Sequence, residues 1–173
     1  MRVPSFPALR LLSALALALA VAACAPAPRY PTNASFVATT PAQVATAPGN
    51  FADAQVVWGG TVIGVDNAQD HTEIRILGYP LDASQRPRLQ QPAIGRFIAD
   101  VPGFLDPLDY PDGVPVTVLG RIHGAQTSSV GNAAYRYPVV SIQGQDLHRW
   151  TAEEMRQGHP NIHFGVGVGV GIR

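Results

Sequence analysis

Alternating apolar and polar residues predict short β-strands through the middle of the chain. Val56–Val65 is β-branched and aromatic, and its Gly59-Gly60 pair indicates a bulge or a close backbone approach. Thr72–Leu77 alternates, so Ile74 and Ile76 share one face and Glu73 and Arg75 the other. The polar residues that begin at Asp66 predict a turn between the two strands. Together these segments predict a β-hairpin.

Four further segments also predict β-strands, and no convincing helix lies in the residues between them. These segments are Gly95–Val101, Val114–Ile122, Tyr135–Ile142 and Leu147–Trp150. Short strands separated by turns rich in glycine and proline are typical of an antiparallel meander that closes on itself. We therefore predict an all-β domain over residues 51–150. Its expected architecture is a small antiparallel β-barrel that is OB-like and partly open.

The C-terminal segment 151–173 predicts one short helix and a tail. Thr151 and Glu154 fit a capping box, and Gly158 and Pro160 end the helix after about two turns. In Gly165–Ile172, glycine alternates with valine or isoleucine. This period of two fits a strand with its large side chains on one face, and a flexible glycine tail is the alternative.

Residues 1–23 have the layout of a secretory signal peptide. Arg2 and Arg10 supply positive charge, Leu11–Val21 is apolar, and small residues follow. The apolar run has 11 residues, whereas a membrane-spanning helix needs about 20. We expect cleavage between Ala23 and Cys24.

Cys24 is the single cysteine of the chain, so it has no intramolecular partner for a disulfide. The sequence V-A-A-C resembles the bacterial lipobox, which implies a lipid-modified cysteine at the start of a mature chain of 150 residues. Chance placement after an ordinary signal peptide is the alternative. Two or three acyl chains on one residue give durable membrane attachment. By the sorting rules that go with this resemblance, Ala25 favours the outer membrane over the inner one.

We expect residues 24–50, which follow the signal peptide, to form a lipidated cysteine and a flexible tether. It is rich in alanine, proline and threonine, nearly uncharged, and has no sustained period of 2 or 3.6. Its prolines interrupt helices and sheet ladders. We expect a disordered tether that lifts the domain off the membrane.

Charge excludes one class of partner. The chain has 12 Lys+Arg against 12 Asp+Glu, and removing Arg2 and Arg10 leaves a mature balance near −2. It contains no basic run of the kind that binds nucleic acid. We therefore expect no nucleic-acid partner.

The chain has no recognisable phosphate or metal motif. The glycine-rich end lacks the spacing of a dinucleotide fingerprint, and the chain contains no lysine for a P-loop. His159 and His163 have a spacing that suits zinc on a helix, but Pro160 lies between them. We expect exposed loop histidines here, and we predict neither a metal nor a cofactor.

Candidate catalytic residues are also weak. Asp106, Asp109 and Asp112 could act as calcium ligands or paired carboxylates, but their prolines and glycine favour turns. Ser128 and Ser129 lack the G-x-S-x-G context of a hydrolase nucleophile. We predict no catalytic residue and no enzyme activity.

Eight aromatic residues are expected to form the core and rim of the barrel, with a ligand pocket as the alternative: Trp58, Tyr79, Phe97, Phe104, Tyr110, Tyr135, Tyr137 and Trp150.

Five blocks in conserved order resemble the Slp family of starvation-inducible outer-membrane lipoproteins: VVWGGTVIGVDN, TEIRILGYPLD, GRFIADVPGFLDPLDY, VPVTVLGRIHG and AYRYPVVSIQGQDLHRW. The resemblance covers residues 51–150. It implies a periplasm-facing lipoprotein on the inner leaflet of the outer membrane, associated with starvation or stationary phase. It implies no catalytic residues.

Three functions compete on this sequence. The first is a structural or interaction module of the cell envelope, with an unknown envelope protein as partner and the membrane held through acyl chains. The second is a binding domain for a small or polymeric envelope ligand, seated in the barrel mouth beside the GFLDPLDYPDG loop. The third, an unrecognised hydrolase, needs a nucleophile and a base that the sequence does not pair.

Overall fold

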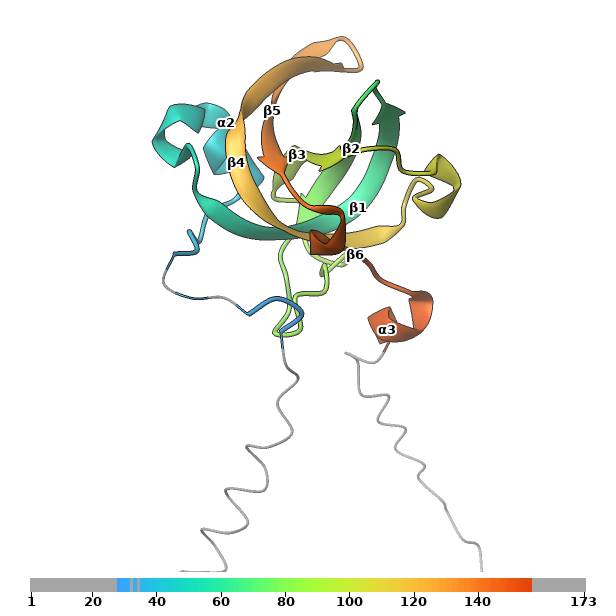
Figure 1. Cartoon of the computed structure of the whole chain (residues 1–173). Helices are drawn as coiled ribbons and strands as arrows, with labels where there is room; N and C mark the ends of the chain where they lie inside the picture. The colour runs from blue at the N-terminus through green and yellow to red at the C-terminus, as the bar shows by residue number, and fades with distance from the viewer. Residues whose placement is uncertain (1–27, 32, 34, 157–173) are drawn as a thin grey trace, which may run out of the picture.

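The computed structural model of the chain describes residues 28–31, 33 and 35–156 (Figure 1). Every strand predicted over residues 51–150 is present, so the all-β prediction is confirmed. The strands are β1 (Gln55–Asn67), β2 (His71–Tyr79), β3 (Gly95–Pro102), β4 (Pro115–Val130), β5 (Ala133–Ser141) and β6 (Leu147–Arg149). The helices are α2 (Pro41–Thr46) and α3 (Ala152–Arg156), with 3₁₀ turns η1 (Pro48–Phe51), η2 (Pro107–Asp109) and η3 (Gly144–Asp146).

Strands β1 to β5 form a ring. Neighbouring strands follow the order β1-β2-β3-β5-β4, and β4 pairs again with β1. This six-stranded, ring-like sheet matches the all-β, OB-like class that the sequence predicted, but it is not a true barrel. The ring is weakest between β3 and β5, where three residue pairs join the strands. Strand β6 pairs with β4 over Val116–Val118, beyond the stretch that β5 occupies.

One pairing corrects the prediction of an entirely antiparallel sheet. Strands β3 and β5 run parallel, with Ile98 opposite Val139. The reason is geometric, because a ring with an odd number of strands cannot reverse direction at every pairing. The period of two within each strand is the same in either case, so it carries no information about direction.

Gly60 allows β1 to approach β2 closely. A Cβ atom built on Gly60 would lie 1.9 Å from the carbonyl oxygen of Leu77, closer than any side chain permits. The predicted close backbone approach is therefore confirmed at this position. The bulge in β1 falls slightly later, where the register shifts between Val62 and Gly64.

The core lies inside the ring and is built from the inward positions of each strand. On β2, Ile74 and Ile76 are fully buried, as the alternation predicted. The rings of Trp58 and Phe97 meet edge to face, with centroids 5.2 Å apart. Further buried members are Val56, Val62, Ala99, Val101, Val116, Val118, Ile122 and Val140.

The segment before β1 differs from the tether that the sequence predicted over 24–50. Helix α2 begins with a capping box, since the Gln43 amide donates to Thr40 Oγ1 at 3.2 Å and the Thr40 amide donates to Gln43 Oε1 at 2.9 Å. Val44 on this helix is fully buried in the core. Ahead of the helix, Phe36 bridges to Gln55 at the start of β1.

The folded domain thus begins before residue 51. Proline content misled the prediction here, because Pro41 and Pro48 occupy the first positions of α2 and η1. At that position the missing amide has no intrahelical acceptor to lose, and the fixed backbone angle of proline favours the helix. The expected tether can extend only through the residues that precede this packed segment.

Candidate functional site

A groove of about 1030 Å³ lies on the surface of the domain. Its lining comes from three stretches of chain that are distant in sequence: the β2–β3 connection over 82–91, the residues before β4 over 111–115, and the C-terminal segment over 150–156. The middle stretch is the end of the GFLDPLDYPDG loop, beside which the sequence placed a ligand. The fold brings all three together.

Asp82 organises the first wall. Its Oδ1 accepts hydrogen bonds from the amides of Ser84 at 2.8 Å and Arg86 at 2.9 Å, and its Oδ2 accepts from Arg86 Nε at 2.9 Å. Burial raises the pKa of the Asp82 carboxyl, but the hydrogen bonds and charge of Arg86 outweigh burial and lower this pKa overall. The connection is therefore a structured turn around an ionised carboxylate.

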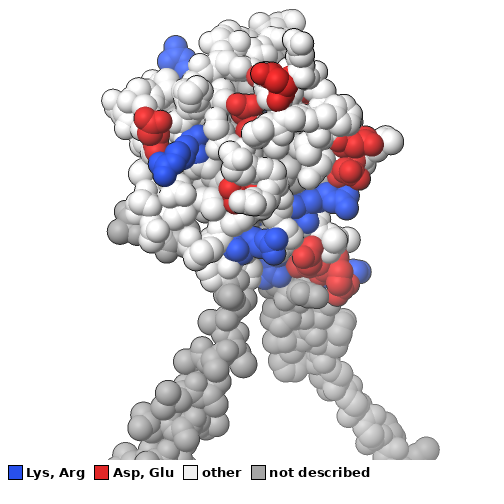
Figure 2. All heavy atoms as spheres, viewed as in Figure 1, with Lys and Arg blue, Asp and Glu red and all other residues white. Residues whose placement is uncertain are grey.

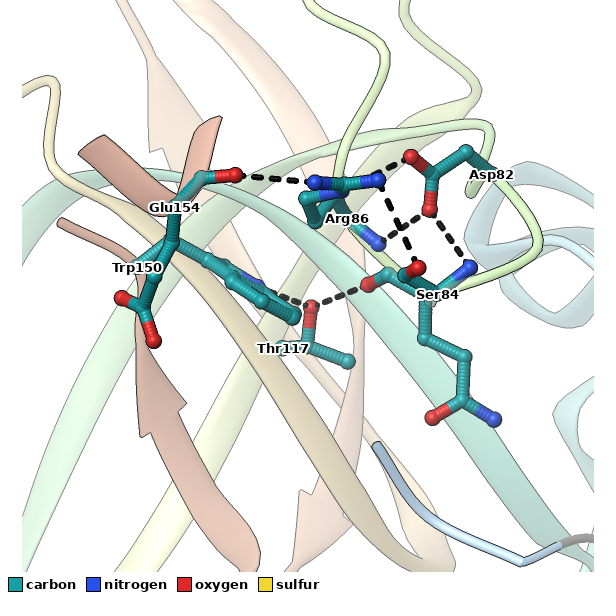
Figure 3. Close-up of polar contacts among 7 residues, drawn as sticks. Asp82, Ser84, Arg86, Thr117, Trp150 and Glu154 are labelled. Atoms are coloured by element: carbon teal, nitrogen blue, oxygen red, sulfur yellow. Dashed lines mark hydrogen bonds and ion pairs between the residues drawn. The ribbon is translucent and has the colours of Figure 1, made fainter. Parts of the chain in front are cut away.

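Arg86 joins this wall to the C-terminal segment. Its Nη1 donates to the carbonyl oxygen of Glu154 at 2.9 Å, across 68 residues of sequence (Figure 3). The Arg86 side chain is 11% exposed, so this contact is largely shielded from water. The Arg86 side chain thus fixes the spacing between two sides of the groove.

Thr117 makes a second connection beneath the groove. Its hydroxyl donates to the Gln85 carbonyl at 2.7 Å and accepts from Trp150 Nε1 at 2.8 Å (Figure 3). The Gln85 side chain in turn pairs with the backbone of Tyr30, with distances of 2.7 and 2.8 Å. Burial is the main reason that the pKa of the Tyr30 phenol is raised to about 12. Four chain segments therefore meet below the groove, and its shape is preorganised.

Helix α3 forms the far wall and confirms the predicted capping box. The Glu154 amide donates to Thr151 Oγ1 at 3.2 Å, and the Thr151 amide donates to Glu154 Oε2 at 2.8 Å. The second of these hydrogen bonds is the largest reason that the pKa of the Glu154 carboxyl is lowered. Met155 and Arg156 on this helix face the groove.

His148 lies beside this wall. Its ring meets the Trp150 indole edge-on, with centroids 4.3 Å apart, and its Nε2 lies 3.7 Å from Glu154 Oε1. The pKa of His148 is lowered, and burial is the largest cause of this shift. The neighbouring carboxylate opposes this shift without reversing it.

The chemistry of the groove suits recognition. Apolar surface comes from Pro87, Leu89, Val114, Met155 and Trp150. Arg88, Gln90 and Gln91 are exposed on the rim and present a cation and two amides. The residues that line the groove include no serine, cysteine or histidine. A volume near 1000 Å³ is at the upper end of the range for ligand pockets.

The aspartates of the GFLDPLDYPDG loop form turns, as the sequence predicted. Asp106 caps η2, its Oδ1 accepting from the Leu108 amide at 2.9 Å. Asp109 ends η2, and Asp112 precedes Gly113, whose φ is +87°. Within residues 28–31, 33 and 35–156, no group of three or more His, Cys, Asp or Glu side chains is arranged to hold a metal ion.

The other predicted residues fall into those that the structure does not describe, those that are buried and those that are exposed. Cys24, Ala23, His159, His163 and the Gly/Val tail lie outside the described residues. Of the eight aromatics, Trp58, Phe97, Tyr137 and Trp150 are buried, as expected for a core. Phe104 departs from this expectation, because 73% of its surface is exposed.

Sequence reasoning missed the groove itself. Its key contacts join Arg86 to Glu154 and Gln85 to Tyr30, and no local period connects such distant residues. The D-A-S-Q-R stretch from Asp82 did contain a signal, since aspartate commonly accepts from the amides that follow it in a turn. That signal predicts a turn but does not predict which distant residues the turn contacts.

Fold and groove together define the class as a small all-β domain with a preformed external groove. Comparison with known proteins then gives the family. The model of the outer membrane lipoprotein Slp family matches residues 21–166, and the chain belongs to this family.

Three relatives illustrate the relationship. The chain is 41% identical over 108 residues to the protein named Uncharacterized lipoprotein YeaY of Escherichia coli K12, covering 62% of this chain and 54% of that protein. It is 33% identical over 135 residues to Outer membrane protein Slp of the same organism, covering 78% and 68%. It is 30% identical over 94 residues to an uncharacterized protein of Haemophilus influenzae, covering 54% and 50%. The matched region thus spans about half the length of the first and third relatives.

Family membership gives the location as the outer membrane, as the family description states. Among the residues that the structure describes, no helix is both long and apolar enough to cross a membrane.

Proposed function

We propose that this chain is a lipid-anchored, periplasm-facing interaction module of the outer membrane, without enzymatic activity, that acts in envelope adaptation during starvation or stationary phase. The observation that carries the proposal is the preformed groove. Its walls are held by charged and neutral hydrogen bonds among four chain segments, centred on Arg86 and Thr117. A groove that needs little rearrangement loses little conformational entropy when it binds a partner.

The anchoring part of the proposal rests on Cys24 and the lipobox-like V-A-A-C. Acyl chains on Cys24 would hold the domain at the membrane, and the packed segment from Phe36 onward would set its distance from the anchor. The protein should fractionate with the outer membrane and carry acyl mass on its N-terminal peptide. Cys24→Ser should release it. Wild-type protein recovered entirely in the soluble fraction, without acyl mass, would contradict anchoring.

The groove itself is tested by in-cell crosslinking in stationary phase. A photoreactive amino acid replaces Gln91, an exposed residue of the rim, and a matched variant carries it at Asn132, an exposed residue of the β4–β5 turn. We expect a protein adduct from position 91 that is absent from position 132. Adding Arg86→Ala should reduce the adduct, because the groove walls separate. Equal adducts at both positions would refute a role of the groove.

The second candidate is a binding domain for a small or polymeric envelope ligand. The specific observation that favours it is the combination of the Trp150 indole with exposed Arg88, Gln90 and Gln91 in a cavity of about 1030 Å³. Aromatic surface with amides and a cation suits a polar ligand that also has an apolar face. Non-protein material that co-purifies with the wild type, and is lost in Arg88→Ala, would favour this function over a protein partner.

A further inference from the structure

The connection between β3 and β4 presents two large apolar side chains to solvent. Phe104 is 73% exposed and Leu108 is 86% exposed. We call Phe104, Asp106, Leu108 and Asp109 the loop tip. Single exposed apolar residues are ordinary, but here two lie within five residues of one another on one loop.

The backbone of this loop is firmly held. The Leu105 amide donates to Thr72 Oγ1 at 3.1 Å, and Asn67 Nδ2 donates to the Leu105 carbonyl at 3.0 Å. Thr72 Oγ1 also donates to the Gly103 carbonyl at 2.8 Å. Asn67 belongs to β1 and Thr72 to β2, so these hydrogen bonds hold the start of the loop against both strands.

The loop also divides its apolar residues between two sides. Leu105 and Tyr110 pack against the core, whereas Phe104 and Leu108 point away from it. The cap by Asp106 on the Leu108 amide fixes the turn that separates the two sets. Burying Phe104 and Leu108 would therefore require a partner, because the loop cannot turn them inward without losing these contacts. A rigid apolar pair of this kind loses little conformational entropy when a partner buries it.

The surroundings of the apolar pair are acidic. Residues 103–113 contain three aspartates and no arginine, lysine or histidine. The Asp70 carbonyl accepts a hydrogen bond from the Gly103 amide, and a hydrogen bond from His71 is the main cause that lowers the pKa of the Asp70 carboxyl. Arg149 is the nearby counter-charge, and its Nη1 donates to the Asp109 carbonyl at 3.0 Å. Figure 2 shows acidic atoms at the edge of the domain where Figure 1 places this loop.

We infer that the loop tip is the docking surface for a protein partner that has an apolar pocket rimmed by lysine or arginine. Phe104 and Leu108 enter the pocket, and Asp106 and Asp109 face the basic rim. The charge argues against a lipid surface, because anionic headgroups repel an acidic loop and attract basic ones. This inference rests on the proposed interaction function and assigns it a surface separate from the groove.

The test uses the full-length protein in stationary-phase cells. A photoreactive phenylalanine derivative replaces Leu108, and a control variant carries it at Val37, which is 40% exposed outside this loop. We expect a protein adduct from position 108 alone. Sequencing of the crosslinked peptide should show apolar residues next to lysine or arginine. Phe104→Ser should lower adduct yield about tenfold, the range for removing a central interface residue.

Charge is tested by Asp106→Asn with Asp109→Asn. Asparagine keeps the side-chain oxygen that caps η2, so the loop retains its shape while its charge falls. Adduct yield should fall several-fold, and the purified complex should weaken as salt rises. An unchanged thermal midpoint would show that both variants remain folded. Adducts that are insensitive to the double variant would overturn the inference.

Other outcomes are equally decisive. Crosslinks to lipid or to a second copy of this chain would overturn the inference. So would binding to phosphatidylethanolamine–phosphatidylglycerol vesicles that depends on Phe104, tested with unlipidated chain. An adduct from Gln91 with none from position 108 would refute the loop tip and leave the proposed function intact. Loss of adducts at both positions would refute both.

Discussion

Val44→Ala provides the sharpest test of where the folded domain begins. Val44 lies in a segment that its sequence marks as a proline-rich tether, yet its side chain is fully buried in the core. Removing two methyl groups costs about 1.6 kcal/mol at roughly 0.8 kcal/mol each. The space left behind adds up to about 1 kcal/mol. Alanine is the better helix former by about 0.5 kcal/mol, which offsets part of the loss.

We therefore expect Val44→Ala to lower the free energy of unfolding by about 2 kcal/mol. The assay is urea unfolding of residues 25–173, followed by circular dichroism and by tryptophan fluorescence. Val37→Ala is the matched control, because Val37 is 40% exposed in the same segment. It should change stability by less than about 0.5 kcal/mol. If Val44→Ala behaved like this control, α2 would not belong to the cooperative unit and our domain boundary would be wrong.

Three further predictions concern the ring, the groove and pH. Gly60→Ala should destabilise the fold by about 3 kcal/mol or more, because the added Cβ would meet the Leu77 carbonyl oxygen. Gly49→Ala is the control, and it should not destabilise the fold because a Cβ on Gly49 would have no atom within 4 Å. Arg86→Ala should lower the unfolding free energy by about 2–3 kcal/mol, since it removes the side-chain donor to Asp82 Oδ2 and to the Glu154 carbonyl. Equal stability of the variant and the wild type in urea would contradict this role. In an NMR titration the imidazole of His71 should titrate above about 6.5 and that of His148 below it, because the Asp70 hydrogen bond raises the first pKa and burial lowers the second. Protonated His71 stabilises the fold below about pH 6.5, and this stabilisation is lost as the pH rises through the raised pKa of His71. His148 is neutral in the folded protein, so its protonation destabilises the fold as the pH falls. The reverse order of titration of the two histidines would contradict the structure.

Local patterns predicted the strands and helix α3 of this protein. The period of two placed Ile74 and Ile76 on the buried face of β2, and the spacing of Thr151 and Glu154 placed the cap of α3. Gly60 signalled a close backbone approach. These features depend on neighbours a few residues away, so the sequence alone reveals them. The blocks of sequence between residues 51 and 150 also determined the family, which the family model confirms.

Only the tertiary structure decided how the elements meet. The parallel pairing of β3 with β5 follows from closing a ring of five strands, which no single strand encodes. The groove depends on Arg86 meeting the Glu154 carbonyl across 68 residues, and Val44 reaches the core because its helix packs on the ring. The same side chains would satisfy the local patterns without these contacts. What selects the contacts is the combined burial of apolar surface and pairing of polar groups over the whole domain.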